Sequence, residues 1–479
     1  MFRPSARPIA PDSGPGSGPW LLVALVAVLV VLAGCAGAPV AGDGPAPGGA
    51  DEGGPTSDRG AGWSWPDDPP EDVIGWEGGY WHNESIDVNQ SDGLDAAERE
   101  AFVARTMARV EYVREREFTD PVPVEVLSRD AYREQNAFSP PESPWDEQVW
   151  EALFLIDEET TVAETFDALY GSNVLGYYSP GEDRIVLVSD TATPTMDRAT
   201  LAHELVHALQ DQVFEFPPGQ STRDASLARN GIVEGDARYV EQLYEERCRS
   251  GEWDCVPRPD RESSGAPPNE GVLLTVLQPY ADGPTLVHTL RQRGGWDAVD
   301  AAYETLPAST EQTIHPKTYP DERPRDVRVP DRSDRAWRPV EHDPTANTLG
   351  EASIFAMFWA NDIVADESLR TGTGRYSYYN YSHPRSDGWA GDAIVPYTNG
   401  SDYGYVWVTE WDSAAEAEQF RSSYVLLLKL RMGGVFVDDG VYEVADGPYA
   451  DAFRVTRTGD RVVIVNAPRV ADLERVHRP

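Results

Sequence analysis

Residues 203–207, His-Glu-Leu-Val-His, restrict the fold of this chain more than any other segment. Positions i and i+4 of an α-helix lie on one face, so the side chains of His203 and His207 can meet at one point. Leu201 and Leu205 fall on the opposite side of the same helix. The pattern therefore predicts a helix with one apolar face in the core and its paired histidines facing a cleft.

The same spacing is typical of a metal site. Imidazole nitrogens are zinc ligands, and Glu204, beside the first histidine, is placed to act as a general base on a metal-bound water. Random sequence of this composition contains about 0.01 such motifs per chain of this length. The alternative is a surface helix that carries paired histidines by chance.

A third protein ligand is expected, because a catalytic zinc has three such ligands and one open position. Glu234, in Val-Glu-Gly-Asp-Ala, lies 27 residues after His207 on the next predicted helix. The turn-rich segment 216–221 allows that helix to return antiparallel to the first. Gly235 would permit a close approach of the two helices.

The chain is strongly acidic, with a formal net charge of −41 from 81 acidic and 40 basic residues in 479. Such a field repels polyanions, which argues against a nucleic-acid partner. Two of the basic residues are lysines, Lys317 and Lys429, and the others are arginines. This composition resembles that of haloarchaeal proteins, where a Debye length of about 3 Å at molar salt screens self-repulsion. The alternative is an ordinary acidic secreted protein from a GC-rich genome.

Residues 1–34 have the pattern of a lipoprotein signal peptide. Arg3 and Arg7 precede an apolar run of 14 residues at 20–33, which is short for a membrane-spanning helix. The run ends in Leu-Ala-Gly-Cys, which looks like a lipobox and makes Cys35 the expected lipidation site. The alternatives are a plain anchor or a cleaved signal with an incidental cysteine.

Three further features fit an exported chain. Residues 35–70 are rich in Gly, Ala, Pro and Asp and are predicted to be a disordered tether. Cys248 and Cys255 are expected to form a disulfide, with two free thiols as the alternative. Asn-x-Ser sequons mark candidate glycosylation sites, at Asn83, Asn89, Asn380 and Asn399.

Hydrophobic periodicity predicts an α+β chain with two folded parts. Residues 71–365 are expected to form a module with a small mixed β-sheet, 366–390 a surface loop, and 391–479 a small α+β domain. Helices are predicted over 94–117, 145–155, 195–213, 224–247, 272–293, 296–305, 348–363 and 413–431. Strands are predicted over 122–127, 174–178, 184–188, 393–397, 403–411, 441–444, 452–457 and 461–466.

The motif-bearing segments resemble a known family, the gluzincin branch of the zincin metallopeptidases. In that branch a His-Glu-x-x-His helix is followed by a glutamate on the next helix. Residues 201–212 and 233–237 are similar to a zincin-like group of bacterial and archaeal surface proteins, as are 296–319 and 388–392. The resemblance covers roughly residues 90–420 and implies a zincin-like fold for residues 71–365.

The resemblance also implies a zinc site with Glu204 as general base and three ligands, His203, His207 and Glu234. The sequence departs from well-studied members, because Glu-Gly-Asp-Ala stands in place of an Asn-Glu-x-x-Asp motif. Asp236 is expected to point away from the metal. Asp211, one turn after His207, is placed to orient a ligand, with a solvated acid as the alternative.

Peptide hydrolysis further needs a donor to the developing oxyanion. His315 and Tyr319, in a His-Pro-x-x-Tyr segment, are the candidates, and Tyr280 is a weaker one. The alternative for His315 is a loop histidine that caps local structure. The strand 184–188 corresponds in position to the zincin edge strand that pairs with extended substrate, with a core strand as the alternative.

Two functions follow from these patterns. The first is a lipid-anchored zinc metallopeptidase on the extracellular face of the cell membrane, acting on a peptide or protein substrate. The second is a non-catalytic zincin-fold surface lipoprotein with a binding or structural role in the cell envelope. Glu204 favours the first, because a structural metal site needs no base between its ligands.

Overall fold

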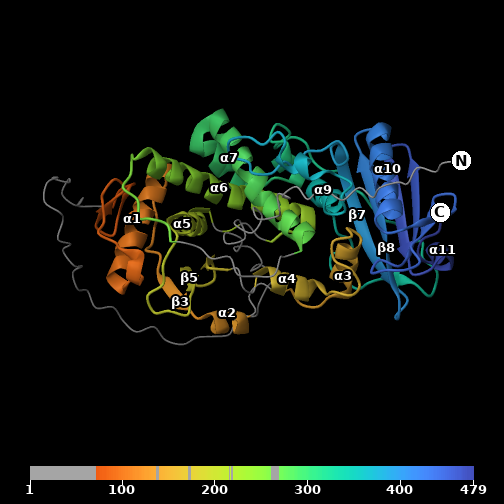
Figure 1. Cartoon of the computed structure of the whole chain (residues 1–479). Helices are drawn as coiled ribbons and strands as arrows, with labels where there is room; N and C mark the ends of the chain where they lie inside the picture. The colour runs from red at the N-terminus through yellow and green to blue at the C-terminus, as the bar shows by residue number, and fades with distance from the viewer. Residues whose placement is uncertain (1–71, 136–139, 171–173, 215, 217–218, 260–268) are drawn as a thin grey trace, which may run out of the picture.

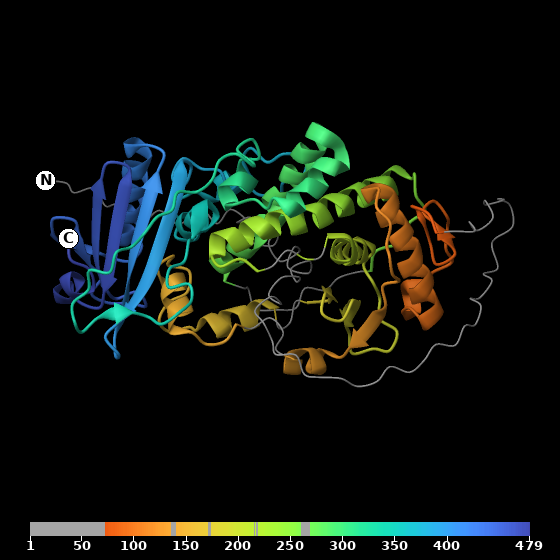
Figure 2. The ribbon, with the colours of Figure 1, turned by 180° about the vertical axis from the view of Figure 1, so that it is seen from behind.

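The computed structural model describes residues 72–135, 140–170, 174–214, 216, 219–259 and 269–479. The predicted signal peptide, the lipidation site Cys35 and the tether lie outside the described residues. The described part is mixed α+β, as predicted, and elongated, with α1 near one end and a β-sheet at the other (Figures 1 and 2).

The helices and strands are bounded as follows. The helices are α1 (Ala96–Arg114), α2 (Arg129–Gln135), α3 (Pro144–Glu151), α4 (Val162–Tyr170), α5 (Arg198–Phe214), α6 (Arg223–Ser250), α7 (Glu270–Glu304), α8 (Thr310–Ile314), α9 (Gly350–Ala360), α10 (Ala414–Leu430) and α11 (Leu473–Val476). The strands are β1 (Trp76–Glu77), β2 (Tyr80–Trp81), β3 (Val124–Leu127), β4 (Gly176–Ser179), β5 (Arg184–Val188), β6 (Arg338–Pro339), β7 (Trp389–Thr398), β8 (Tyr403–Trp411), β9 (Val435–Asp438), β10 (Val441–Glu443), β11 (Ala452–Thr458) and β12 (Arg461–Ala467). Short 3-10 turns occupy Gln90–Asp92, Asp366–Arg370 and Val470–Asp472.

Short polar residues begin the main helices by accepting hydrogen bonds from otherwise unpaired backbone amides. Asp95 and Glu98 form a reciprocal capping box at the start of α1. Thr222 caps α6 and Asn269 caps α7. The predicted helices 272–293 and 296–305 together make up α7, and a kink at Gly294 and Gly295, whose backbone is not helical, separates the two helical stretches as predicted.

Helices α5, α6 and α7 form the layer that carries the candidate site. Helix α6 packs against both α5 and α7 (Figure 1). Gly235 of α6 lies against Gly283 of α7, and a Cβ atom on Gly235 would lie 2.5 Å from the Gly283 carbonyl carbon. The close approach predicted for Gly235 therefore exists, but its partner is α7 rather than α5.

The small sheet lies beside α5 and has the order β3-β5-β4. Strand β5 pairs in parallel with β3 and antiparallel with β4. The prediction that 184–188 is an edge strand is therefore wrong, because β5 is flanked on both sides. The edge strand beside α5, the helix that carries His203 and His207, is β4, because β4, rather than β3, packs against this helix.

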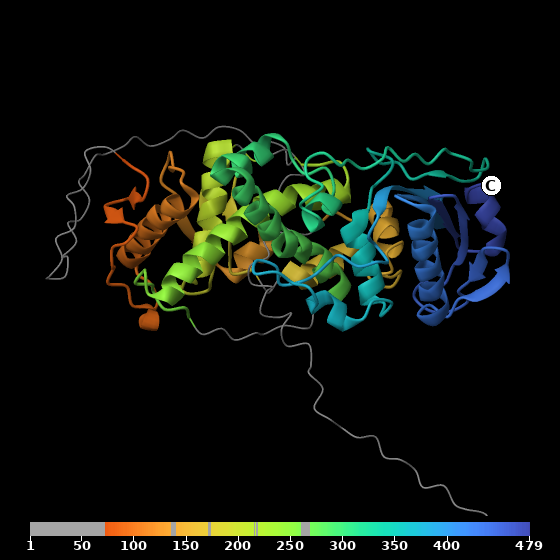
Figure 3. The ribbon, with the colours of Figure 1, turned by 90° about the horizontal axis from the view of Figure 1, so that it is seen from above.

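The large sheet has seven strands in the order β6-β7-β8-β12-β11-β10-β9. It includes β6 at Arg338–Pro339, so this unit reaches back beyond the predicted boundary at 391. One hydrophobic core runs without interruption from α3, α7 and α9 into β7, β8 and α10. Figure 3 shows α9 between the long central helices and the sheet.

Residues 366–390 are largely irregular, but the predicted surface loop is only partly exposed. Tyr376, Tyr379 and Tyr381 are buried. The hydroxyl of Tyr381 donates to the carbonyl of Leu274 in α7 at 2.6 Å. The segment is thus packed against the helical layer. No described helix combines the length and apolar character needed to cross a bilayer.

The Gly235–Gly283 contact predicts the effect of adding one methyl group. We expect Gly235→Ala to lower the free energy of unfolding by about 1–3 kcal/mol, because the new Cβ meets backbone atoms that cannot rotate away. This exceeds the gain of up to about 1 kcal/mol in helix propensity. Thermal and denaturant unfolding in molar salt measure the change. Gly181→Ala is the control, because a Cβ there meets no atom within 4 Å, and an equal loss in both variants would contradict the packing argument.

Candidate metal centre

Helices α5 and α6 bring the three predicted ligands together. Asp197 Oδ1 accepts hydrogen bonds from the amides of Ala199 and Thr200 and so begins α5. His203 and His207 follow on successive turns of this helix, and Glu234 lies on α6. All three side chains are buried, with at most 1% of each residue exposed.

The ligand atoms of the three residues face one another. His203 Nε2 lies 3.2 Å from Glu234 Oε2 and 3.1 Å from His207 Nε2. His207 Nε2 lies 3.3 Å from Glu234 Oε2. Four tetrahedral ligands about 2.0–2.1 Å from zinc would be about 3.3 Å apart. The three atoms therefore have the spacing of one face of a zinc tetrahedron, and two imidazoles with one carboxylate suit that metal.

Two further side chains orient the histidines. His207 Nδ1 lies 2.8 Å from Gln210 Oε1, and Gln210 Nε2 donates to the carbonyl of Val233. His203 Nδ1 lies 3.4 Å from Glu241 Oε2. Contacts of this kind hold a ligand's Nε2 toward a metal and increase its basicity.

Sequence reasoning missed both of these residues, although their spacing from the predicted ligands indicates that they lie on the same helix faces. Gln210 is one turn after His207 on α5, and Glu241 is two turns after Glu234 on α6. Each therefore lies on the same helix face as a ligand. A search for polar residues at these offsets would have found them.

The charges of the centre depend on one another. Burial opposes ionisation of Glu234, yet the charge of His207 and hydrogen bonds from both histidines lower its pKa to about 2. Burial also opposes the charged form of His203, but hydrogen bonds to Glu234 and Glu241 raise its pKa to about 10. His203 is therefore protonated and paired with the anion of Glu234, and a cation bound by both residues would have to displace that proton.

Glu204 lies beside these ligands and is itself buried, with 2% exposed. Its Oε2 accepts a hydrogen bond from the backbone amide of Tyr178 in the edge strand β4 at 2.9 Å. Burial raises its pKa to about 7, although the neighbouring imidazoles of His203 and His207 oppose this shift. A carboxyl group in this range can both accept and release a proton near neutral pH.

The two predicted oxyanion donors have other contacts. His315 Nε2 lies 3.1 Å from Glu351 Oε1 in a separate cluster. The Tyr319 hydroxyl donates to the carbonyl of Thr305 at 2.6 Å. Both polar groups thus have partners other than the three ligands, and the role of these residues as oxyanion donors stays a prediction. Tyr280 is nearer, since its ring stacks 6.0 Å from that of His203.

The two acidic neighbours of the motifs also have identified partners. Asp211 accepts a hydrogen bond from the Tyr178 hydroxyl at 2.9 Å, which ties α5 to β4. Asp236 points away from the centre, as predicted, and pairs with Arg114 at 3.0 Å. Gln210 has the orienting position that sequence reasoning gave to Asp211.

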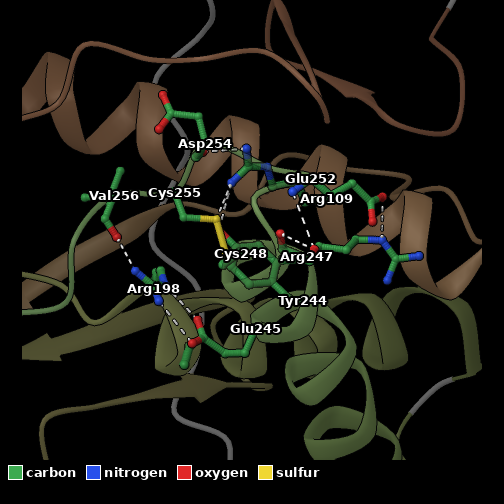
Figure 4. The surroundings of a disulfide bond; sticks show 12 residues. Arg109, Arg198, Tyr244, Glu245, Arg247, Cys248, Glu252, Asp254, Cys255 and Val256 are labelled. Carbon is green, nitrogen blue, oxygen red and sulfur yellow. Dashed lines mark hydrogen bonds and ion pairs between the residues drawn. A yellow bond between two sulfur atoms is a disulfide. The ribbon is translucent and has the colours of Figure 1, made fainter.

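The predicted disulfide joins Cys248 at the end of α6 to Cys255 (Figure 4). The closed loop is held on two neighbouring helices. Arg109 of α1 donates to the carbonyl of Asp254, and Arg198 of α5 donates to that of Val256. The disulfide thus fixes the end of α6 beside the start of α5.

The four predicted glycosylation sites differ in exposure. Asn83 and Asn89 are exposed, and Asn380 and Asn399 are partly buried. Asn399 Nδ2 donates to Asp402 in a turn, so a glycan there would first have to displace that contact.

Comparisons with known proteins add one match. A family model described as a domain of unknown function (DUF8575) matches residues 338–477. The match begins at β6 and covers the large sheet, but not the metal centre. No curated protein and no solved structure matches the chain.

The contact of Gln210 with His207 predicts a change in metal affinity. We expect Gln210→Ala to weaken zinc binding by about 10–100-fold, because His207 loses the group that orients its ring. Competition with a coloured chelator measures the affinity. Gln212→Ala is the matched control on the same helix, since Gln212 binds the Thr119–Asp120 segment instead. Equal affinity in the two variants would show that Gln210 has no orienting role.

Proposed function

We propose that this chain is a zinc-dependent metallopeptidase of zincin-like fold, anchored by lipid at Cys35 to the extracellular face of the cell membrane. One observation carries the proposal: the buried set His203, His207 and Glu234 has zinc-ligand spacing and lies beside the carboxyl of Glu204. The acidic, lysine-poor composition supports activity at high salt.

The residues of the centre divide into ligands and a base. His203, His207 and Glu234 would hold zinc, which supplies a Lewis acid for the carbonyl and lowers the pKa of water. Glu204 would accept a proton from the attacking water and deliver it to the leaving amine. Burial raises the pKa of Glu204, whereas the charge of a bound zinc would lower it and so favour the carboxylate that accepts the proton.

Strand β4 supports an extended peptide as the substrate. Its pairing with β5 leaves the other side of the strand without a sheet partner among the described residues. Tyr178 directs its amide from that side to Glu204, so this edge faces the centre. An extended chain that added to β4 would bring its carbonyl groups close to the general base.

A second candidate function is a non-catalytic surface protein that a bound metal stabilises. The burial of the centre favours it, because the ligands are at most 1% exposed and Glu204 is 2% exposed. A closed site suits a structural metal, whereas catalysis needs access for substrate. In this case Glu204 would serve mainly as the acceptor for the Tyr178 amide.

Replacement of Glu204 by glutamine separates the two candidates. We expect the purified chain in molar salt with zinc to cleave members of a peptide library, and Glu204→Gln to lower kcat by about 10²–10⁴-fold with zinc content unchanged. Glu304→Gln, at the exposed end of α7, is the control. Zinc binding without cleavage by the wild-type chain would favour the structural role, and full activity of Glu204→Gln would exclude Glu204 as the base.

A further inference from the structure

A second cluster of metal-binding side chains lies where the helical layer meets the large sheet. His315 directly follows α8, Glu351 is in the first turn of α9, and Asp387 precedes β7. The three residues come from segments far apart in the sequence. Their meeting is therefore a product of the fold rather than of a local motif.

The ligand atoms of this cluster lie close together. His315 Nε2 is 3.1 Å from Glu351 Oε1 and 3.9 Å from Asp387 Oδ1. One ligand atom from each residue lies within 4.8 Å of the others. The first distance matches the spacing of neighbouring ligands around a small cation, and the second exceeds it by about half an ångström.

Glu351 supplies an independent sign that this cluster is suited to a cation. The residue is completely buried, at 0% exposed. Its Oε2 atom has no hydrogen-bond partner among the described residues. A buried carboxylate oxygen without a donor is costly, and a bound cation would remove that cost.

The cluster is also accessible from one side. The side chains of His315 and Asp387 are 31% and 38% exposed. Asp387 Oδ1 is held in place by the amide of His383 at 2.8 Å and by the Ser382 hydroxyl at 3.1 Å. A cation could therefore enter past two partly exposed ligands and reach the buried one.

We propose that His315, Glu351 and Asp387 bind a second divalent cation, separate from the centre at His203, His207 and Glu234. One imidazole and two carboxylates suit zinc or another first-row transition metal, whereas calcium and magnesium prefer oxygen ligands alone. The cation would join α8 and α9 to the segment that enters β7. It would thus fasten the DUF8575-matching region to the helical layer.

Metal counting in the full-length chain tests this site. After treatment with chelator and dialysis against Zn²⁺ in molar salt, elemental analysis should give one zinc fewer per chain in His315→Ala than in the wild type. Asp387→Asn should lose or weaken the same zinc, while its remaining oxygen still accepts from His383. Asp412→Asn is the control, because Asp412 belongs to a neighbouring acidic group, with Glu311 and Glu322, that has no histidine.

The number of zinc ions per chain distinguishes this second site from the proposed zinc site at His203, His207 and Glu234. If both sites bind, the wild type holds two zinc ions and His315→Ala holds one. If only the second site binds zinc, the wild type holds one zinc ion and His315→Ala holds none. Equal counts in the wild type, His315→Ala and Asp387→Asn would overturn the proposal and leave an ion pair between His315 and Glu351. Binding of Ca²⁺ in preference to Zn²⁺ at this site would overturn the metal class.

Thermal unfolding gives a second readout that needs no count. Zinc should raise the melting temperature of the Asp412→Asn variant as much as that of the wild type, because a ligand that binds only the folded state stabilises it. The rise should be smaller in His315→Ala and Asp387→Asn. An equal rise in all four proteins would contradict a cation link between α9 and β7.

Discussion

The burial of three polar side chains at one point between α5 and α6 is the constraint on which the rest of the structure depends. Charged or polar groups removed from water are costly unless they pair with one another. His203, His207 and Glu234 meet this requirement through contacts of 3.1–3.3 Å. Such contacts leave little freedom in the separation or rotation of the two helices.

The surrounding residues fix that separation and rotation from several sides. Gly235 and Gly283 bring α6 and α7 into backbone contact. On another face of α6, Asp236 pairs with Arg114 of α1 and accepts from the Tyr303 hydroxyl at 2.9 Å. Glu234 and Asp236 are two residues apart, so two separate networks hold α6 in one rotational position. The placement of Glu241 near His203 then follows from the helix repeat.

Sequence patterns were sufficient where the chemistry is local. The spacing of His203 and His207 and the downstream glutamate predicted a cluster that the structure brings together. The periodicity of hydrophobic residues predicted the bounds of α5, of α10 and of the β4–β5 hairpin to within a few residues. It did not reveal α4 or β9. Both are short. The buried residues of α4, Val162, Thr165 and Leu169, do follow the helical repeat, whereas β9 exposes all four of its residues and shows no alternation.

Sequence patterns were insufficient to predict strand order and side-chain contacts that join segments far apart in the sequence. Periodicity cannot show that β5 has neighbours on both sides, because strand order depends on β3, more than 50 residues earlier. It also gave no sign of the partners that His315 and Tyr319 have in the fold. Each residue type suits an oxyanion donor, but the contacts to Glu351 and Thr305 arise only from tertiary packing. The same packing supplies the second cluster, which has no sequence motif of its own.

The segment Gly388-Trp-Ala-Gly-Asp392 is one of those that resemble the zincin-like group of surface proteins. In the fold it has a structural role. Asp392 accepts from the amides of Leu349 and Gly350 at the start of α9, each at 2.9 Å. It also accepts from the indole nitrogens of Trp389 and Trp407. Burial raises its pKa to about 6, although these four donors favour the charged form. The sheet thus caps a helix that packs on α7. The large sheet shares a hydrophobic core with α3, α7 and α9, whereas α5 and α6 lie in a second core to which α7 also contributes.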